Sequence, residues 1–202
     1  MVVALAASAQ GAGLSRPCFD FDTPVVEPLH PPIAMVPGRD NNVFGTYPSG
    51  VSWAATRARV TMPITALYAK VLDHRNHKDM TKTVLTTTDL PRPGYLHFQR
   101  VDVVVTVRAL LFNVKLPWTE EWAFSLLEGT PEAPRRILAS YQLADARTRH
   151  LKHQCGSYVL QALDAASADL SMYDEVIADH RSAEDTRNMQ AGILSSIRGE
   201  EP

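Results

Sequence analysis

Between residues 83 and 177 the 202-residue chain consists of a series of strand-like segments with no helical period between them. Each is a short run rich in β-branched and aromatic residues, and turn sequences such as Pro91-Arg92-Pro93-Gly94 separate several of them. The segments span residues 83–88, 95–107, 109–116, 120–127, 136–141, 154–163 and 169–177. Parallel strands need long crossover connections, usually helices. The sequence therefore predicts an antiparallel sheet.

One more strand and two helices flank this series. Residues 51–61 are expected to form a strand, and residues 63–75 an amphipathic helix that begins at a proline. A second helix is expected from Ser182, a typical N-cap, to Arg198. The fold class is therefore α+β.

Proline and glycine are concentrated before residue 51, where the sequence has neither the strand period nor the helical period. We interpret residues 1–50 as an N-terminal arm and residues 51–202 as one domain. Residues 19–26 carry enough apolar side chains for the arm to lie across that domain.

Charge and hydropathy exclude several classes of partner. The net charge is -2 and basic residues are scattered, so no nucleic acid partner is expected. No run approaches the roughly 20 apolar residues that span a bilayer. We expect a monomer, with peripheral contact to a membrane surface left open.

The first nine residues are small and apolar, and Ala7-Ser8-Ala9 has the small-x-small pattern of a signal-peptidase site. No Lys or Arg precedes this run, so residues 1–9 are either the remnant of a signal peptide or an unrelated start. A cytoplasmic location is favoured, with secretion or a periplasmic location as the alternatives.

Cysteine and histidine do not form a recognisable metal motif. We expect Cys18 and Cys155 to be free thiols, one of them buried. Two His-x-x-His pairs are interpreted as solvated surface histidines; they are His74 with His77 and His150 with His153. No metal and no cofactor are predicted.

Carboxylates near the end of the last predicted strand have two interpretations. Asp174, Glu175 and Asp179 could perform acid/base chemistry, but a solvated strand edge is the favoured interpretation. No nucleophile motif is present, and no catalytic residue is assigned.

The order of strand, helix, six or seven antiparallel strands and long C-terminal helix resembles the helix-grip fold of the START-type (SRPBCC) superfamily. Val60-Thr61-Met62-Pro63, leading into a helix that ends near Asp73, is similar to its first strand and helix. Residues 156–163 followed by 168–173 are similar to its closing hairpin. The resemblance covers about residues 51–198. It implies a curved antiparallel sheet of about seven strands wrapped around the C-terminal helix, with an apolar internal cavity.

Alternate residues from 118 to 126 would share one face of a strand. We interpret this face as the wall of a ligand pocket with Glu120 as a polar anchor, although ordinary core packing is the alternative. If Glu120 is buried without a cationic partner, its pKa should rise. The predicted ligand-binding residues are Trp118, Glu120, Trp122, Phe124, Tyr141, Tyr158, Met189 and Ile193.

Three functions remain open. The favoured one is non-enzymatic: binding or transfer of a hydrophobic small molecule, such as a lipid, in an internal cavity. The second is an enzyme similar to polyketide cyclases and dehydratases, in which Glu120 or Tyr141 moves a proton. The third is a protein-interaction domain with a filled core and an arm that engages a partner.

Overall fold

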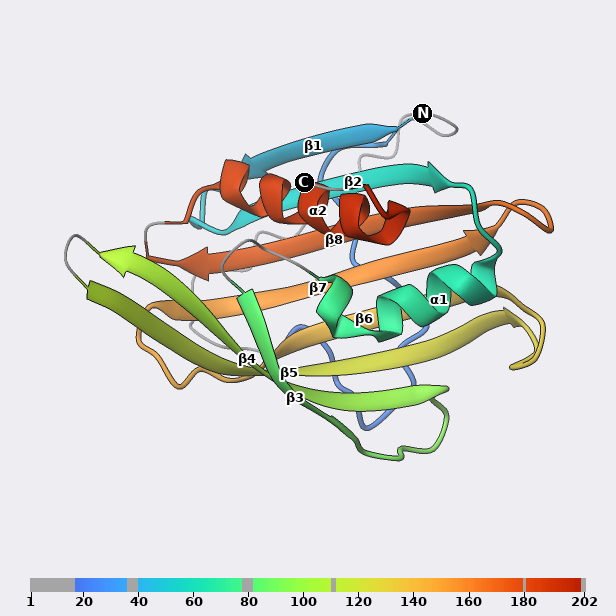
Figure 1. Cartoon of the computed structure of the whole chain (residues 1–202), viewed down its shortest axis with the longest axis horizontal. Coiled ribbons are helices and arrows are strands. Elements are labelled where there is room, and N and C mark those ends of the chain that lie inside the picture. Colours follow the sequence, from blue (N-terminus) through green and yellow to red (C-terminus); the bar gives the residue numbers. More distant parts are fainter. Residues whose placement is uncertain (1–16, 36–39, 78–81, 110–111, 180, 201–202) are drawn as a thin grey trace, which may run out of the picture.

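The computed structural model describes residues 17–35, 40–77, 82–109, 112–179 and 181–200 (Figure 1). Its strands are β1 Asn41–Thr46, β2 Ser52–Val60, β3 Lys82–Asp89, β4 His97–Ala109, β5 Phe112–Gly129, β6 Pro134–Asp145, β7 Leu151–Ala162 and β8 Ala168–Ala178. Its helices are α1 Ile64–Leu72, the 3₁₀ helix η1 His74–Asn76 and α2 Ala183–Arg198.

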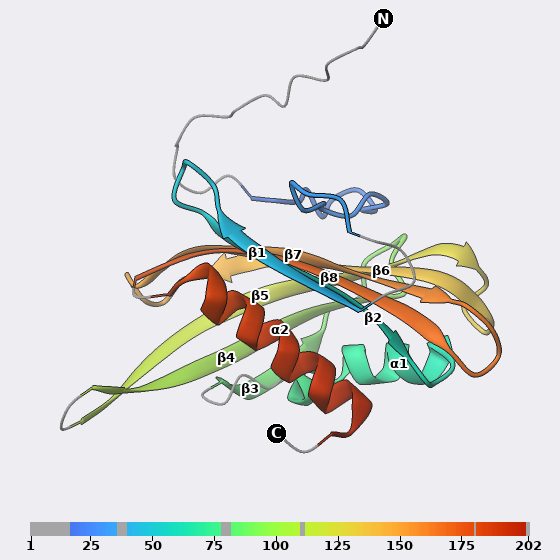
Figure 2. The ribbon, with the colours of Figure 1, turned by 90° about the horizontal axis from the view of Figure 1, so that it is seen from above.

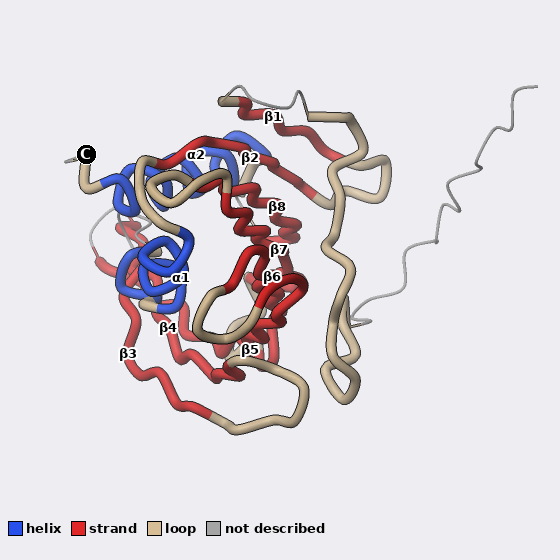
Figure 3. Tube along the Cα trace, turned by 90° about the vertical axis from the view of Figure 1, so that its right-hand side faces the viewer, coloured by secondary structure: helices blue, strands red, loops and turns tan. Residues whose placement is uncertain are grey.

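The strands form one sheet in the order β1-β2-β8-β7-β6-β5-β4-β3. Every neighbouring pair is antiparallel, as the absence of crossover helices predicts. The end-on view in Figure 3 shows the sheet curling around the two α-helices. The predicted α+β helix-grip class is therefore confirmed, with eight strands in place of about seven.

The additional strand, β1, lies within residues 1–50, which were predicted to form an irregular arm. It pairs with β2 from Asn41 opposite Arg57 to Thr46 opposite Ser52. Asn41, Asn42 and Gly45 are poor strand formers, so local propensity gives little signal. The ladder to β2 and the contact of α2 with β1 stabilise it instead.

β5 is one long strand where the sequence predicted two, over residues 109–116 and 120–127. Pro117 lies between the two predicted segments, and proline removes a ladder donor. In the structure Pro117 pairs with Val104 on β4, whereas β6 joins β5 only from Thr119 onward. Among the described strand pairs, β5 is therefore paired at Pro117 with β4 alone and is an edge on its other side. Proline is tolerated at such an edge, because no partner strand needs its missing N–H.

Both α-helices cover the concave face of the sheet (Figure 2). α1 buries Ile64, Leu67 and Val71 at helical spacing and packs on β6 and β7. α2 packs on β1, β2 and β8; its first turn is fixed by a capping box between Ser182 and Asp185. None of the described helices is long and apolar enough to cross a bilayer.

Residues 17–35 of the arm lie on the convex face, opposite the helices (Figures 2 and 3). Phe19 and Phe21 are buried there, as the apolar character of residues 19–26 predicts. The Phe21 ring meets the edge of Phe98 with centroids 5.5 Å apart. The Leu29 amide donates a hydrogen bond to Ser157 Oγ at 2.8 Å.

The expectation of two free thiols was wrong, because Cys18 and Cys155 form a disulfide. Cys155 is on β7 and its side chain points to the convex face, where residues 18–21 of the arm cross the sheet. The two residues are 137 positions apart, so spacing alone gave no indication that they would meet. The bridge attaches the arm to the middle of the sheet.

Candidate ligand-binding site

All eight residues predicted to bind a ligand are buried, with exposed fractions of at most 7%. Trp118, Trp122 and Phe124 share the concave face of β5, as alternation predicts. Glu120 is also on β5, and the remaining four residues come from β6, β7 and α2. All except Glu120 belong to one continuous apolar core. The sequence therefore identified residues of one face, whose binding role stays a prediction.

An aromatic cluster surrounds Trp122 in the middle of this face. Tyr141 lies directly opposite Trp122 in the β5–β6 register, and the two rings stack with centroids 4.3 Å apart. Tyr158 presents its ring at 5.5 Å in an edge-to-face arrangement. His74 and His77 cover the same indole at 4.8 and 5.0 Å. In the described structure these rings fill the space beside Trp122.

Glu120 is next to this cluster, in contact with the Trp122 indole, and only 1% of its surface is exposed. Alternation along β5 places one tryptophan on each side of it, and both indoles donate to its carboxyl oxygens: Trp118 Nε1 to Oε1 and Trp122 Nε1 to Oε2, each at 2.9 Å. The Gln154 amide on β7 donates a third bond at 3.3 Å. Glu120 is thus an inward-facing hydrogen-bond acceptor, and it is not at a wet strand end.

A second buried carboxyl, that of Asp174, anchors a polar row across the concave face. The Tyr141 hydroxyl donates to Asp174 Oδ1, and the Gln190 amide on α2 donates to Oδ2 at 2.6 Å. Gln190 also donates to the Ala54 carbonyl at 3.0 Å and accepts from Thr56 Oγ1 at 2.7 Å. Asp174 is fully buried, so its interpretation as part of a solvated strand edge was wrong.

Gly156 makes room for the Tyr141–Asp174 bond. It lies between Tyr141 and Asp174 in the strand register, and a Cβ there would stand 2.5 Å from Asp174 Oδ1. We expect Gly156→Ala to lower the free energy of unfolding by about 1–3 kcal/mol through overpacking. Urea denaturation measures this loss, with exposed Lys152→Ala on the same strand as the control. Equal stability of both variants would show that the row is not tightly packed.

The histidines of the first His-x-x-His pair are not on the surface, which corrects the sequence interpretation. His74 and His77 are each 3% exposed and lie on and just after η1. His74 Nε2 is 2.8 Å from Gln99 Oε1, and His77 Nε2 is 2.8 Å from the Val71 carbonyl. A short 3₁₀ turn has no periodic signal, so the sequence could not show that these rings face inward.

Burial controls the ionisation of the two central tyrosines. Desolvation, followed by the charge of Asp174, raises the pKa of the Tyr141 and Tyr158 hydroxyls well above the usual 10.0. Both hydroxyls therefore stay protonated at neutral pH and serve as hydrogen-bond donors.

These shifts predict a loss of stability in alkali. Below pH 10 the tyrosines are protonated in both states, but above it the unfolded chain releases protons that the folded protein retains. Each tyrosine then lowers the free energy of unfolding by about 1.4 kcal/mol per pH unit. Urea denaturation at pH 9, 10 and 11 measures the slope. A constant stability across this range would contradict the burial of these hydroxyls.

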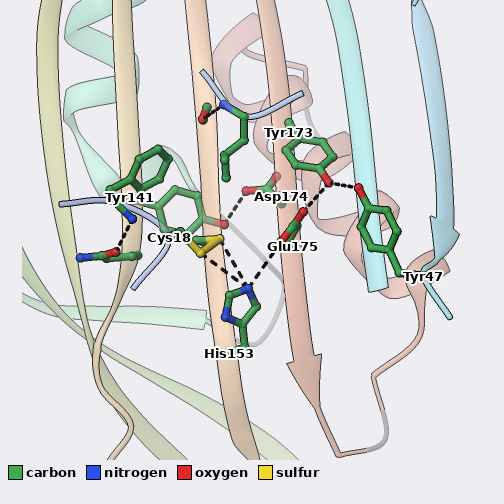
Figure 4. The surroundings of a disulfide bond; sticks show 12 residues. Cys18, Tyr47, Tyr141, His153, Tyr173, Asp174 and Glu175 are labelled. Carbon is green, nitrogen blue, oxygen red and sulfur yellow. Dashed lines mark hydrogen bonds and ion pairs between the residues drawn. A yellow bond between two sulfur atoms is a disulfide. The ribbon is translucent and has the colours of Figure 1, made fainter. Parts of the chain in front are cut away.

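On the convex face, a chain of polar groups leads from the disulfide through His153 and Glu175 to Tyr173 (Figure 4). His153 Nε2 is 3.6 Å from Cys18 Sγ, 3.5 Å from Cys155 Sγ and 3.6 Å from Glu175 Oε2. Glu175 accepts from the Tyr173 hydroxyl at 2.6 Å. Burial opposes ionisation of Glu175, but hydrogen bonds from His153 and Tyr173 hold its pKa below the usual value.

The two sulfurs and His153 have the residue types of a metal site. In the disulfide, however, neither sulfur is available as the thiolate that binds metals. The second His-x-x-His pair is divided. His150, just before β7, has its Nδ1 atom 3.2 Å from Asp179 Oδ2, whereas His153 contacts the sulfurs of the disulfide.

Sequence reasoning missed several polar residues of the concave face, and two of them carried a usable signal. Asp174 alternates with Leu170, Met172 and Val176 on β8 and so occupies a core-facing position. Gln190 lies within the buried stripe of α2, one turn before Ile193. A polar residue at a core position of a strand or helix marks a buried hydrogen-bond network.

Comparison with known proteins supports the architecture. No protein-family model and no curated protein matches the sequence. Among solved structures, the lipid transfer and protein localization domain of human StarD13 aligns with a TM-score of 0.56 at 10% identity, over 82% of this chain and 86% of that domain.

Two further structures align less closely. The Zhui aromatase/cyclase from Streptomyces sp. R1128 gives a TM-score of 0.48 at 14% identity, over 74% of this chain and 92% of the enzyme. The STAR-related lipid transfer protein fragment from Xanthomonas axonopodis gives 0.49 at 10% identity, over 78% of this chain and 97% of the fragment. At these identities the likeness concerns the fold alone. The order of the strands, the helices on the concave face and the StarD13 alignment together give the chain the START-type helix-grip fold.

Proposed function

We propose that this protein binds an uncharged, largely apolar small molecule between the concave face of the sheet and its two α-helices. The observation that carries the proposal is the composition of this face, where an aromatic cluster and an apolar core surround Glu120 and Asp174. Ligand sites typically combine apolar walls with a few placed polar groups.

The polar groups define the chemistry of the ligand. Glu120 and Asp174 present carboxyl oxygens, which accept hydrogen bonds from hydroxyl or amine groups. Two buried carboxyl groups disfavour an anionic ligand in a low-dielectric interior. A molecule with an apolar body and a hydroxyl group therefore fits this face better than a free fatty acid.

The ring cluster sets a condition on entry. His74 and His77 cover Trp122, so a ligand that reaches the indole takes the place of these rings. His74 lies on η1 and His77 is its C-cap, so both histidines belong to a single helical turn. Trp122 and Tyr141 lie instead on strands that are paired on both sides. Displacement of the turn breaks fewer hydrogen bonds than displacement of a strand, so η1 is the proposed gate.

Titration with the uncharged fluorescent probe N-phenyl-1-naphthylamine tests this site. We expect saturable binding with quenching of tryptophan emission. Trp122→Phe should weaken probe affinity about fivefold, because a smaller ring removes apolar contact area.

Trp53→Phe is the matched control, since Trp53 is also buried but packs on the convex face with Tyr173 and Tyr47. Its probe affinity should equal that of the unaltered protein. Absence of probe binding, or equal weakening by both variants, would exclude the concave site and favour the interaction domain with a filled core.

A second candidate function is proton-transfer catalysis of the polyketide cyclase type. The observation that favours it is the bond from the Tyr141 hydroxyl to Asp174, because a buried carboxyl beside a hydroxyl is suited to acid/base chemistry. Incubation with a synthetic poly-β-ketone, followed by chromatography, tests it. Cyclisation that disappears in Tyr141→Phe would establish catalysis, whereas identical product ratios with and without protein would exclude it.

A further inference from the structure

A second cavity lies on the opposite side of the sheet from the proposed ligand site. It has a volume of about 380 Å³, is open to solvent on one side, and lies between residues 28–35 of the arm and the convex faces of β2, β6, β7 and β8. That volume is within the range of small-molecule sites. The arm therefore creates a cavity that the sheet alone would not have.

The arm wall of this cavity is held at several points. The disulfide attaches Cys18 to β7, and the Phe19 amide donates to Gln142 Oε1 at 3.0 Å. The Leu29 amide donates to Ser157 Oγ, at the edge of the cavity itself. Covalent and hydrogen-bonded attachment gives the cavity a defined shape.

The sheet side of the cavity carries an excess of positive charge. Arg57 pairs with Asp169 at 2.7 Å, which leaves Arg136 as the second guanidinium of the lining. Among the described residues no carboxylate pairs with Arg136, and the Nε atoms of both arginines are buried without a hydrogen-bond acceptor. The neighbouring carboxylate Glu128 pairs instead with Arg135. Buried donors without acceptors are costly, so an anion at this position would be stabilised.

The arm side of the cavity is apolar except for His30. Leu29, Ile33 and Met35 line it, and Val159 extends the apolar surface onto β7. Ile33 leaves 48% of its surface exposed, an unusual exposure for a large apolar side chain that faces a cavity. The lining thus offers a guanidinium group to an anion and an apolar surface to a hydrocarbon chain.

We propose that the cavity between the arm and the convex face is a binding site for a monocarboxylate with an apolar tail. The carboxylate contacts Arg136, and the tail lies along Ile33 and Met35. This ligand class is the opposite of the one expected on the concave face, where carboxyl groups disfavour anions. The two sites are therefore separable by ligand charge.

Calorimetric titration with decanoate and with decanol tests the proposal. Decanoate should bind the unaltered protein. Arg136→Gln should lower the affinity for decanoate about 10- to 100-fold, because it removes a charge-assisted contact with the carboxylate. Arg136→Lys should restore part of the affinity because it keeps the charge. Decanol has the same tail without the carboxylate, so its binding should not respond to Arg136→Gln.

Arg135→Gln is the matched control, because Arg135 is the neighbouring arginine but its side chain is 71% exposed and outside the cavity lining. It should leave decanoate affinity unchanged. Ile33→Ser tests the tail contact without touching the sheet, and it should weaken decanoate severalfold. Unaltered decanoate affinity in Arg136→Gln, equal loss in Arg135→Gln, or no decanoate binding at millimolar concentration would overturn the proposal.

Competition separates this site from the concave one. Decanoate should leave bound N-phenyl-1-naphthylamine in place, and reduction of the disulfide should weaken decanoate but not the probe. Displacement of the probe by decanoate with no effect of Arg136→Gln would place the carboxylate on the concave face and contradict the inference. Probe binding can fail while decanoate binding persists, so the proposed function and this proposal fail independently.

Discussion

Trp122→Ala is expected to lower the free energy of unfolding by about 3–5 kcal/mol, the range for a large aromatic side chain removed from a packed core. Trp122 is 1% exposed, stacks on Tyr141 and is covered by His74 and His77. The substitution also removes an indole donor from Glu120. Chemical denaturation monitored by circular dichroism measures the loss.

Leu85→Ala is the control for this prediction, since Leu85 is 57% exposed and should change the stability by less than about 0.5 kcal/mol. If Trp122→Ala cost less than about 1 kcal/mol, the aromatic cluster would not be part of the stable core. Because the expected loss is large, Trp122→Phe is the better variant for binding experiments.

Cys18→Ala is the second substitution with a large expected effect, a decrease of about 3–5 kcal/mol in the free energy of unfolding. The disulfide joins residues 137 positions apart, so its removal restores much conformational freedom to the unfolded chain. Phe19 and Phe21 also lose the anchor that keeps them on the convex face. Denaturation under non-reducing conditions measures the difference.

The same prediction has an internal control. A reducing agent should lower the stability of the unaltered protein to that of Cys18→Ala and should leave the variant unchanged. Cys18→Ala/Cys155→Ala should resemble the single variant, because either substitution removes the same bond. Two free thiols in the denatured, unreduced protein would contradict the disulfide.

The fold was predictable because its determinants are local or periodic. The strand-like segments, the proline at the start of α1 and the capping box of α2 are visible in the sequence and suffice for an antiparallel sheet with a C-terminal helix. β1 was missed because its own residues have little strand propensity. It is stabilised by its pairing with β2. The Cys18–Cys155 bond depends on the path of the arm, which has no periodic pattern.

The candidate site was predictable only in part. Alternation along β5 identified Trp118, Glu120 and Trp122 as residues of one face, but it did not reveal that both indoles donate to Glu120. His74 was interpreted as a surface residue because the sequence around it is charged, whereas η1 turns its ring onto Trp122. Such positions are set by tertiary packing, which one sequence does not specify.

Mass spectrometry of the purified protein under native and denaturing conditions tests whether the concave face binds an uncharged apolar molecule. We expect a small uncharged molecule that is bound in the native spectrum, is released on unfolding and is displaced by N-phenyl-1-naphthylamine. A protein that carries no such molecule and takes up none of the probe would contradict it.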